Sequence, residues 1–192
     1  MPMRPTNNST RISRPTVELK LDANPGPELD TRVDPNRNAV RDHQSIAAAR
    51  PVLSVQVAIS RRGIPAARSI SRWARVALSR VNAVKHVTIR IVGRAEGRRL
   101  NRRFRQRDYA TNVLAFAYDQ ESGDLVLCAP VVAAEARAAG KALRAHYAHL
   151  VIHGVLHLQG YDHLRAADAR KMEARERTLL AELGYPDPYG DE

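Results

Sequence analysis

The sequence predicts an α+β protein of mixed α/β layers, in which a four-stranded sheet is covered by about five helices. Short segments that alternate between apolar and polar residues, or that run apolar between turn residues, indicate the strands. Longer segments repeat apolar residues at helical spacing. The chain has 192 residues, of which 44% are hydrophobic, so it is long enough to bury a substantial core.

Residues 1–50 differ in composition from the rest of the chain. They hold six of the eleven prolines, and the first aromatic residue of the sequence is Trp73. A segment of this kind buries too little apolar area to offset the entropy that ordering would cost. We therefore expect a disordered N-terminal extension over 1–50, an ordered domain over 51–186 and a short C-terminal tail over 187–192.

The first half of the domain predicts a strand, a helix, a second strand and a short basic helix. Residues 52–59 and 86–92 alternate between apolar and polar side chains, as half-buried strands do. Between them, residues 66–82 carry one apolar stripe at helical spacing. The stripe consists of Ile70, Trp73, Ala74, Ala77, Leu78 and Val81. Gly93 ends the second strand, and the basic helix follows at 94–104.

The second half of the domain predicts a β-hairpin followed by three helices. The strands are expected at 113–118 and 124–128, the turn at 121–123, and the helices at 130–140, 143–159 and 166–183. Pro130 suits the first turn of a helix, where the backbone N–H that proline lacks would have no helical partner. Gly184 and Pro186 end the last helix.

Positive charge is concentrated in one part of the chain. The formal net charge is +11, and residues 61–107 hold 15 Lys and Arg against a single acid, Glu96. Such a block favours a polyanionic partner, because basic side chains neutralise phosphates and release their counterions. The alternative is a solvated arginine face without a partner. A membrane surface is less favoured, because no aromatic-rich apolar face accompanies the block.

The sequence also indicates a cytoplasmic protein. Its longest uncharged stretch, 145–161, contains four histidines and is too short to cross a bilayer. The N-terminus lacks the apolar core of a signal peptide. Cys128 is the one cysteine, so it has no partner for an internal disulfide, and we expect it to be a small buried hydrophobe.

Three histidines form the most specific pattern in the sequence, His-x3-His-x5-His, at His153, His157 and His163. Positions i and i+4 share a helix face, and a break at Gly160 can turn the chain back toward the same point. Three imidazoles leave one tetrahedral position open for water, as catalytic zinc sites do. We therefore expect one zinc ion at the end of a central helix, rather than three separately packed histidines.

Two neighbours of these histidines leave alternatives open. His149 is either a fourth polar group at the mouth of the site or a packed side chain, and Asp162 either orients a ligand histidine or is a solvated loop residue. The histidine spacing is shared by metzincin proteases, but Gly154 stands where those enzymes carry the glutamate that activates water. A metzincin-like metalloprotease is therefore a less favoured alternative.

The segment from His153 to His163 reads His-Gly-Val-Leu-His-Leu-Gln-Gly-Tyr-Asp-His, and it resembles the YbeY family of bacterial endoribonucleases, also called rRNA maturation factors. Residues 100–108 with 111–116, and residues 123–128, resemble further elements of that family. The resemblance covers roughly 52–184. The chain departs from the usual Gly, Pro, Ser and Pro of the family at Gln106, Ala110, Ala115 and Ala117.

The resemblance implies a zinc-dependent, single-strand-specific endoribonuclease. It places the metal ligands on His153, His157 and His163, and the functionally important arginine on Arg105. Arg102, Arg103 and Arg107 are expected to steer and hold the RNA backbone. Family members act in ribosomal RNA maturation, including 3′-end processing of the small-subunit RNA, and in ribosome quality control, so single-stranded RNA, ribosomal RNA and the ribosome are the implied partners. A non-catalytic ribosome-assembly factor with a structural metal is the main alternative.

Overall fold

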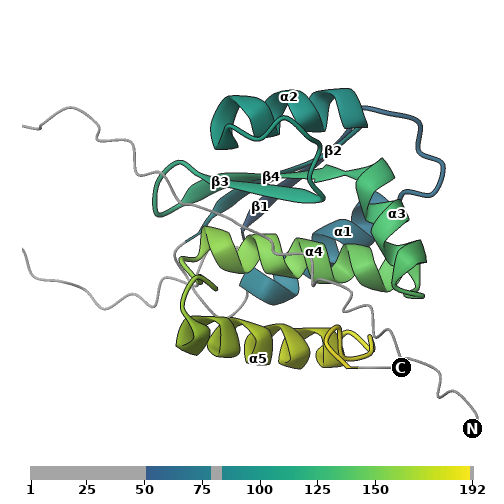
Figure 1. The fold of residues 1–192 in the computed structure, drawn as a ribbon. Coiled ribbons are helices and arrows are strands. Elements are labelled where there is room, and N and C mark those ends of the chain that lie inside the picture. The colour runs from purple at the N-terminus through teal and green to yellow at the C-terminus, as the bar shows by residue number, and fades with distance from the viewer. Residues whose placement is uncertain (1–50, 79–83, 191–192) are drawn as a thin grey trace, which may run out of the picture.

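A computed structural model of the chain describes residues 51–78 and 84–190 (Figure 1). The elements in order are β1 (Val52–Val57), α1 (Ala67–Leu78), β2 (His86–Val92), α2 (Arg94–Arg105), β3 (Val113–Ala117), β4 (Ser122–Cys128), α3 (Ala129–Ala138), α4 (Leu143–Leu158) and α5 (Ala166–Glu182). The predicted layered fold is confirmed. The predictions for residues 1–50 and for Val81 lie outside the described residues.

The four strands form one mixed sheet in the order β1-β2-β4-β3. β1 and β2 pair in parallel, as do β2 and β4, whereas β3 runs antiparallel to β4 and forms an edge of the sheet. Helix α2 covers one face, α1 and α4 cover the other, and α5 lies beneath α4 (Figure 1). The sheet therefore separates α2 from α4.

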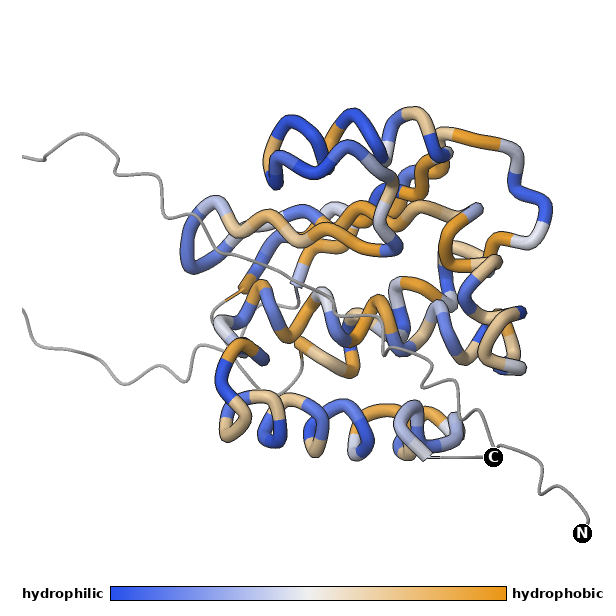
Figure 2. Tube along the Cα trace, in the orientation of Figure 1, coloured by the Kyte–Doolittle hydropathy of each residue, from blue (hydrophilic) through white to orange (hydrophobic). Residues whose placement is uncertain are grey.

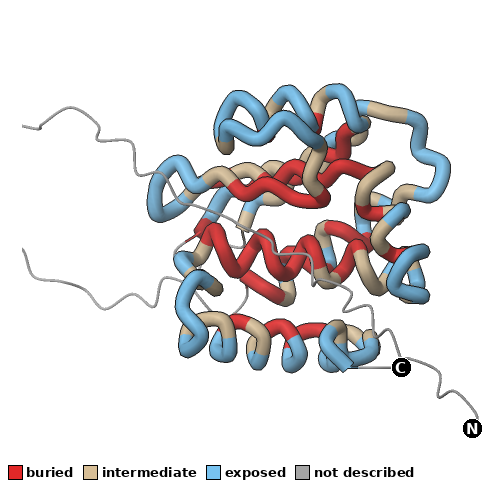
Figure 3. Tube along the Cα trace, in the orientation of Figure 1, coloured by how far each residue is buried: buried red, intermediate tan, exposed pale blue. Residues whose placement is uncertain are grey.

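The outer helix α2 and the inner helix α4 differ sharply in their surroundings. Along α2 the chain is largely hydrophilic (Figure 2) and exposed (Figure 3). In α4, every residue from Leu150 to Leu158 is buried. The apolar residues of α4 join a core formed with the sheet and with α1 and α5, as expected of a helix packed between a sheet and other helices. No helix within the described ranges is both long and apolar enough to cross a membrane.

Most of the apolar stripe predicted for the first helix is confirmed. Of its members, Ile70, Trp73, Ala74, Ala77 and Leu78 are all buried. Cys128 is also buried, and burial raises the pKa of its thiol, so it packs as the small hydrophobe that we expected.

The β-hairpin turn lies earlier than the sequence predicts. Strand β4 begins at Ser122 and includes Gly123, which pairs with Ala117 of β3. The Asp119 carboxylate accepts hydrogen bonds from the backbone N–H groups of Glu121 and Ser122, at 2.7 and 2.6 Å. This aspartate fixes the reversal ahead of Gly123, and the glycine serves a close contact with the chain of β3 rather than the turn.

Candidate metal centre

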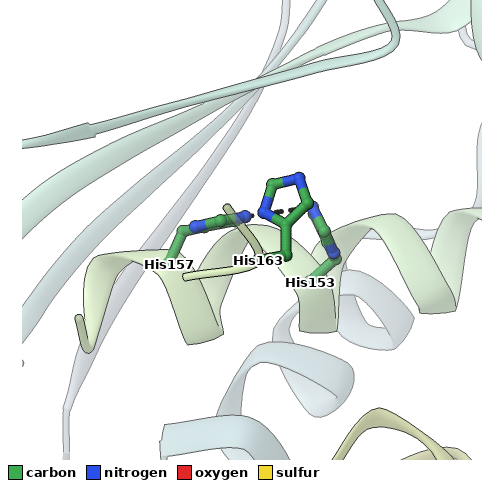
Figure 4. Close-up of side chains that lie close together, drawn as sticks. All are labelled: His153, His157 and His163. Carbon is green, nitrogen blue, oxygen red and sulfur yellow. Dashed lines mark hydrogen bonds between the residues drawn. The ribbon is translucent and has the colours of Figure 1, made fainter. Parts of the chain in front are cut away.

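Helix α4 and the loop after it bring the three predicted histidines together (Figure 4). His153 and His157 lie one turn apart on α4, and both are buried. Gly160 has a φ of 84°, a left-handed conformation that suits glycine, and it reverses the chain as predicted. His163 thereby returns to the helix, with its ring centroid 4.9 Å from that of His157 and 5.5 Å from that of His153.

The arrangement of the nitrogens fits a shared cation. One nitrogen of each histidine lies within 4.8 Å of the others, and the Nε2 atoms of His153 and His157 are 3.1 Å apart. Two nitrogens bound to one tetrahedral zinc at 2.0–2.1 Å would be separated by roughly 3.3 Å. The observed spacing is close to that value, so small side-chain adjustments suffice to bind an ion.

Burial keeps the helical histidines in the form that binds metals. It lowers the pKa of His153, and together with the neighbouring His153 and His163 it lowers the pKa of His157 to about 3. Both imidazoles are therefore neutral at neutral pH. A neutral imidazole offers a nitrogen lone pair to a cation, whereas a protonated ring offers none.

Gly154, between the two helical ligands, packs against the sheet. A Cβ atom at this position would lie 2.8 Å from Cδ2 of Leu125 and 3.4 Å from Cγ2 of Val113. A glutamate side chain here would have to enter the apolar contact between α4 and strands β3 and β4. The structure thus argues against a protease-like base at this position, as the sequence comparison with metzincins does.

Asp162 organises the loop that carries the third histidine. Its Oδ1 atom accepts hydrogen bonds from the backbone N–H groups of His163 and Leu164, at 2.6 and 3.2 Å. The Nδ1 atom of the His163 ring lies farther away, at 3.7 Å. Asp162 thus takes a role that neither alternative described, because its hydrogen bonds order the backbone of the loop that carries His163.

Glu176 is a site residue that the sequence reasoning missed. It lies on α5 with no solvent exposure, and its Oε1 atom is 2.7 Å from Nδ1 of His153. Burial by itself would raise the pKa of Glu176, but hydrogen bonds with His149 and His153 outweigh it and hold the pKa below the usual range of a carboxyl. One signal was available in the sequence, because this charged residue interrupts the buried stripe of Met172, Leu179 and Leu180.

His149 joins the same network instead of the three-histidine group. Its Nε2 atom lies 3.3 Å from Oε2 of Glu176. The hydroxyl of Tyr189, from the segment after α5, also donates a hydrogen bond to this oxygen. His149, His153 and Glu176 form a second group whose potential ligand atoms lie within 4.8 Å of one another.

Arg105 ends α2 and extends to the edge strand of the sheet. Its Nη2 atom donates a hydrogen bond of 3.2 Å to the carbonyl oxygen of Ala115 in β3. Val113 of the same strand faces Gly154 of α4. The neighbouring Gln106 has a left-handed φ of 57°. An L side chain adopts this conformation less readily than glycine, so the backbone at this position would suit glycine.

Arg107 is exposed in the loop that follows α2, and Arg102 and Arg103 lie on the outer side of this helix. A shallow depression there is lined by Ala95, Arg98, Arg99, Arg102, Arg103 and Asp108. Arg98 forms an ion pair with Asp108 at 2.6 Å. The exposed ring of Phe104 packs edge-on against Phe116, with centroids 5.1 Å apart. The basic surface and the histidine cluster therefore belong to helices on opposite faces of the sheet (Figure 1).

A matching family model and two similar proteins share one description. A family model described as "Endoribonuclease YbeY" matches residues 58–184. The "Endoribonuclease YbeY" of Aromatoleum aromaticum is 54% identical over 149 residues, which cover 74% of this chain and 95% of the relative. That of Pseudomonas entomophila is 57% identical over 129 residues, which cover 63% and 82%. A solution structure from Thermotoga maritima aligns with a TM-score of 0.49 at 22% identity, over 73% of this chain and 100% of that one.

Proposed function

The chain belongs to the endoribonuclease YbeY family, and from this premise we propose that it hydrolyses single-stranded RNA with a metal held by His153, His157 and His163. The observation that carries the proposal is the convergence of three imidazole nitrogens within 4.8 Å, two of them on buried rings. Zinc is the metal proposed, since an all-imidazole set with an open fourth position is typical of its catalytic sites.

The chain's own residues supply the binding and orientation that phosphodiester hydrolysis needs. When bound, zinc supplies an activated water and a Lewis acid for the phosphoryl group. Arg105 is proposed as the catalytic arginine, because its planar guanidinium can hold two non-bridging phosphoryl oxygens as charge spreads over them. Its place at the edge of β3, the strand that packs on α4 beside Gly154, supports this role.

The substrate and setting proposed follow from charge and family resemblance together. The arginines of α2, including Arg102 and Arg103, would hold the RNA backbone by phosphate neutralisation. Ribosomal RNA, with 3′-end processing of the small-subunit RNA, is the proposed substrate, and ribosome quality control in the cytoplasm is the proposed setting. The catalytic domain is proposed to span 51–186, with 1–50 as an extension and 187–192 as a short C-terminal tail, of which residues 187–189 contact the domain.

The proposal is tested by metal analysis of the purified protein together with cleavage of a labelled single-stranded RNA. We expect one metal ion per chain, and we expect His157→Ala to lose most bound metal and most cleavage. His86→Ala, at an exposed histidine of β2, is the matched control and should keep both. A wild-type protein that binds one metal per chain but does not cleave RNA, together with a loss of folding in His157→Ala, would instead favour the non-catalytic assembly factor with a structural metal.

A further inference from the structure

The imidazole of His153 faces two partners at once. Its Nε2 atom lies 3.1 Å from Nε2 of His157, inside the three-histidine group. Its Nδ1 atom lies 2.7 Å from Oε1 of Glu176, on the other side of the ring. An ionised carboxylate only accepts hydrogen bonds, so Nδ1 must carry the proton. The neutral ring then presents the Nε2 lone pair to the metal position.

The buried position of Glu176 would destabilise the fold unless both carboxylate oxygens accept hydrogen bonds. The side chain has no solvent exposure, and a carboxylate without partners in such a place would strongly destabilise the fold. Both oxygens have partners: Oε1 faces His153, and Oε2 faces His149 and the hydroxyl of Tyr189. The carboxylate is therefore held in one orientation, directed at the ring of His153.

Tyr189 reaches Glu176 from a C-terminal segment that is itself anchored to the domain. Asp187 accepts a hydrogen bond of 3.1 Å from Arg177 of α5, and the Pro188 carbonyl accepts one from Lys141. The Arg177 guanidinium also lies 4.9 Å from the centroid of the Tyr189 ring. These contacts place the Tyr189 hydroxyl over the carboxylate, so residues 187–189 complete the surroundings of Glu176.

From this geometry we propose that Glu176 is the positioning residue of the metal centre: it fixes the tautomer and orientation of His153, and Tyr189 holds Glu176 in place. The inference rests on the metal site of the proposed function. Partners of this kind around a metal-binding histidine typically change metal affinity by about 10- to 100-fold when they are removed. Glu176 acts through His153 and has no contact with substrate in this scheme.

The first test is made on the metal-free wild-type protein. Nitrogen NMR of the histidine side chains should show the proton of His153 on Nδ1, with Nε2 unprotonated. A proton on Nε2 would overturn the proposal, because that nitrogen would then face His157 with no free lone pair. This measurement needs neither bound metal nor cleavage, so its outcome is separate from the fate of the proposed function.

The second test compares zinc affinity, measured by competition with a chelator, in three variants. Glu176→Gln should bind zinc about 10- to 100-fold more weakly, and Tyr189→Phe should weaken binding by a smaller factor. Asp168→Asn is the matched control, in the first turn of the same helix, where the side chain pairs with the exposed Lys171. The inference would be overturned if the wild type binds zinc and Glu176→Gln binds it with the same affinity. The proposed function would still stand in that case.

A purely structural role for Glu176 is distinguished by thermal melting with and without zinc. A structural residue would lower the melting temperatures of the metal-free and metal-loaded forms alike. A positioning residue must also reduce the increase in melting temperature that saturating zinc produces. If Glu176→Gln fails to fold, Tyr189→Phe supplies the same comparison, since it removes only the hydroxyl that contacts the carboxylate.

Discussion

At the residue scale, Arg105 differs from its basic neighbours in its contacts. The outer arginines of α2 line an open depression, whereas Arg105 is tied to the Ala115 carbonyl on the edge strand. Its guanidinium also lies 6.0 Å from the ring of Phe116. Charge alone could not single out this residue in the sequence, where seven basic residues lie between 94 and 107. Its place beside the strand that packs on α4 supports a distinct role.

Arg105→Lys separates the two roles that a basic residue can have here. Lysine keeps the charge but lacks the planar fork, so single-turnover cleavage at saturating RNA should fall by about 10²-fold or more, with little change in RNA affinity. Arg102→Ala is the matched comparison. It should weaken binding and flatten its salt dependence by about one unit, and it should spare the chemical step. Wild-type cleavage by Arg105→Lys, with loss in Arg102→Ala, would move the catalytic role to Arg102.

The buried histidines predict how the metal-free protein responds to acid. The ordinary pKa of a histidine is 6.5, and burial lowers that of His157 to about 3 in the folded state. Below pH 6.5 the unfolded chain therefore binds a proton that the folded chain excludes. The free energy of unfolding should decrease as the pH falls from 6.5 toward 3.

Urea unfolding of the metal-free protein between pH 7.5 and 4.5 measures this effect. His157→Gln should reduce the slope, and His86→Gln, at an exposed histidine, should keep it. Glu176 does not produce the effect in this window. Its folded pKa lies below the ordinary 4.5, so its contribution is lost only in more acidic solution. A free energy of unfolding that stays constant from pH 7.5 to 5.5 would contradict the prediction.

Part of the site could be predicted from the sequence because it is local. His153 and His157 are four residues apart on one helix, and a glycine follows at the point where the chain must turn. Glu176 could not be placed in the same way. Its contact with His153 depends on how α5 packs under α4, and sequence spacing does not determine that packing. The charged residue on an apolar stripe showed only that something polar had to meet it.

At the element scale, α4 both carries the metal ligands and forms the centre of the core. Its length and its burial followed from the long uncharged run in the sequence. The side that each residue faces did not follow from periodicity, because every residue from Leu150 to Leu158 is buried. Gly154 illustrates this point. In the sequence it is a glycine where metzincins carry the glutamate base, and in the structure it packs against Leu125 and Val113.

Substitutions at Gly154 test this packing role. Gly154→Glu would bury a carboxylate against the sheet, so the free energy of unfolding should fall by more than about 3 kcal/mol. Gly154→Ala should cost about 1–3 kcal/mol, because its Cβ meets the movable end of the Leu125 side chain. Thermal or urea unfolding of both variants measures the difference. A Gly154→Glu protein that melts like the wild type and hydrolyses peptides would revive the metzincin alternative.

The strand boundaries show a second limit of local reasoning. The segment 121–123 has the composition of a turn, yet β4 already begins at Ser122. A Cβ at Gly123 would lie 2.7 Å from both the Phe116 carbonyl oxygen and Cδ2 of Leu158. The glycine is therefore needed for close approach of β3 and α4, and Asp119 makes the turn. A glycine in a sequence is equally compatible with a turn and with a close approach of neighbouring segments. The fold is needed to tell these two roles apart.

At the scale of the whole molecule, the sheet separates two chemical functions. The helices on one side bring together the histidines and Glu176, and the helix on the other side presents the arginines (Figure 1). Arg105 connects the two, since it ends the basic helix and contacts the edge strand that borders α4. An RNA strand that contacts both the arginines of α2 and the histidine cluster would have to pass the edge formed by β3. The basic block of the sequence is therefore divided in space, since its arginines on α1 lie on the same side of the sheet as α4 and those on α2 lie on the other side.

The boundary of the domain is tested by deletion of residues 1–50. The first strand begins at Val52, and its side chains Leu53, Val55 and Val57 pack against the core. Because residues 1–50 hold no aromatic side chain and carry a net charge of only +2, their removal should leave metal content and RNA affinity unchanged. The melting temperature should shift by no more than about 2–4 °C, the equivalent of roughly 1 kcal/mol.

A longer deletion supplies the contrast that makes this result informative. Removal of residues 1–58 also deletes β1, which pairs with β2 over six residues, from Val52 opposite His86 to Val57 opposite Ile91. That deletion exposes the edge of β2 and the apolar surface of α1, so the shortened chain should melt at a much lower temperature or fail to fold. Thermal melting and metal analysis of both shortened proteins test whether the domain begins at residue 51. If removal of residues 1–50 already caused a large loss of stability, these residues would contribute contacts to the core. The domain would then begin before residue 51.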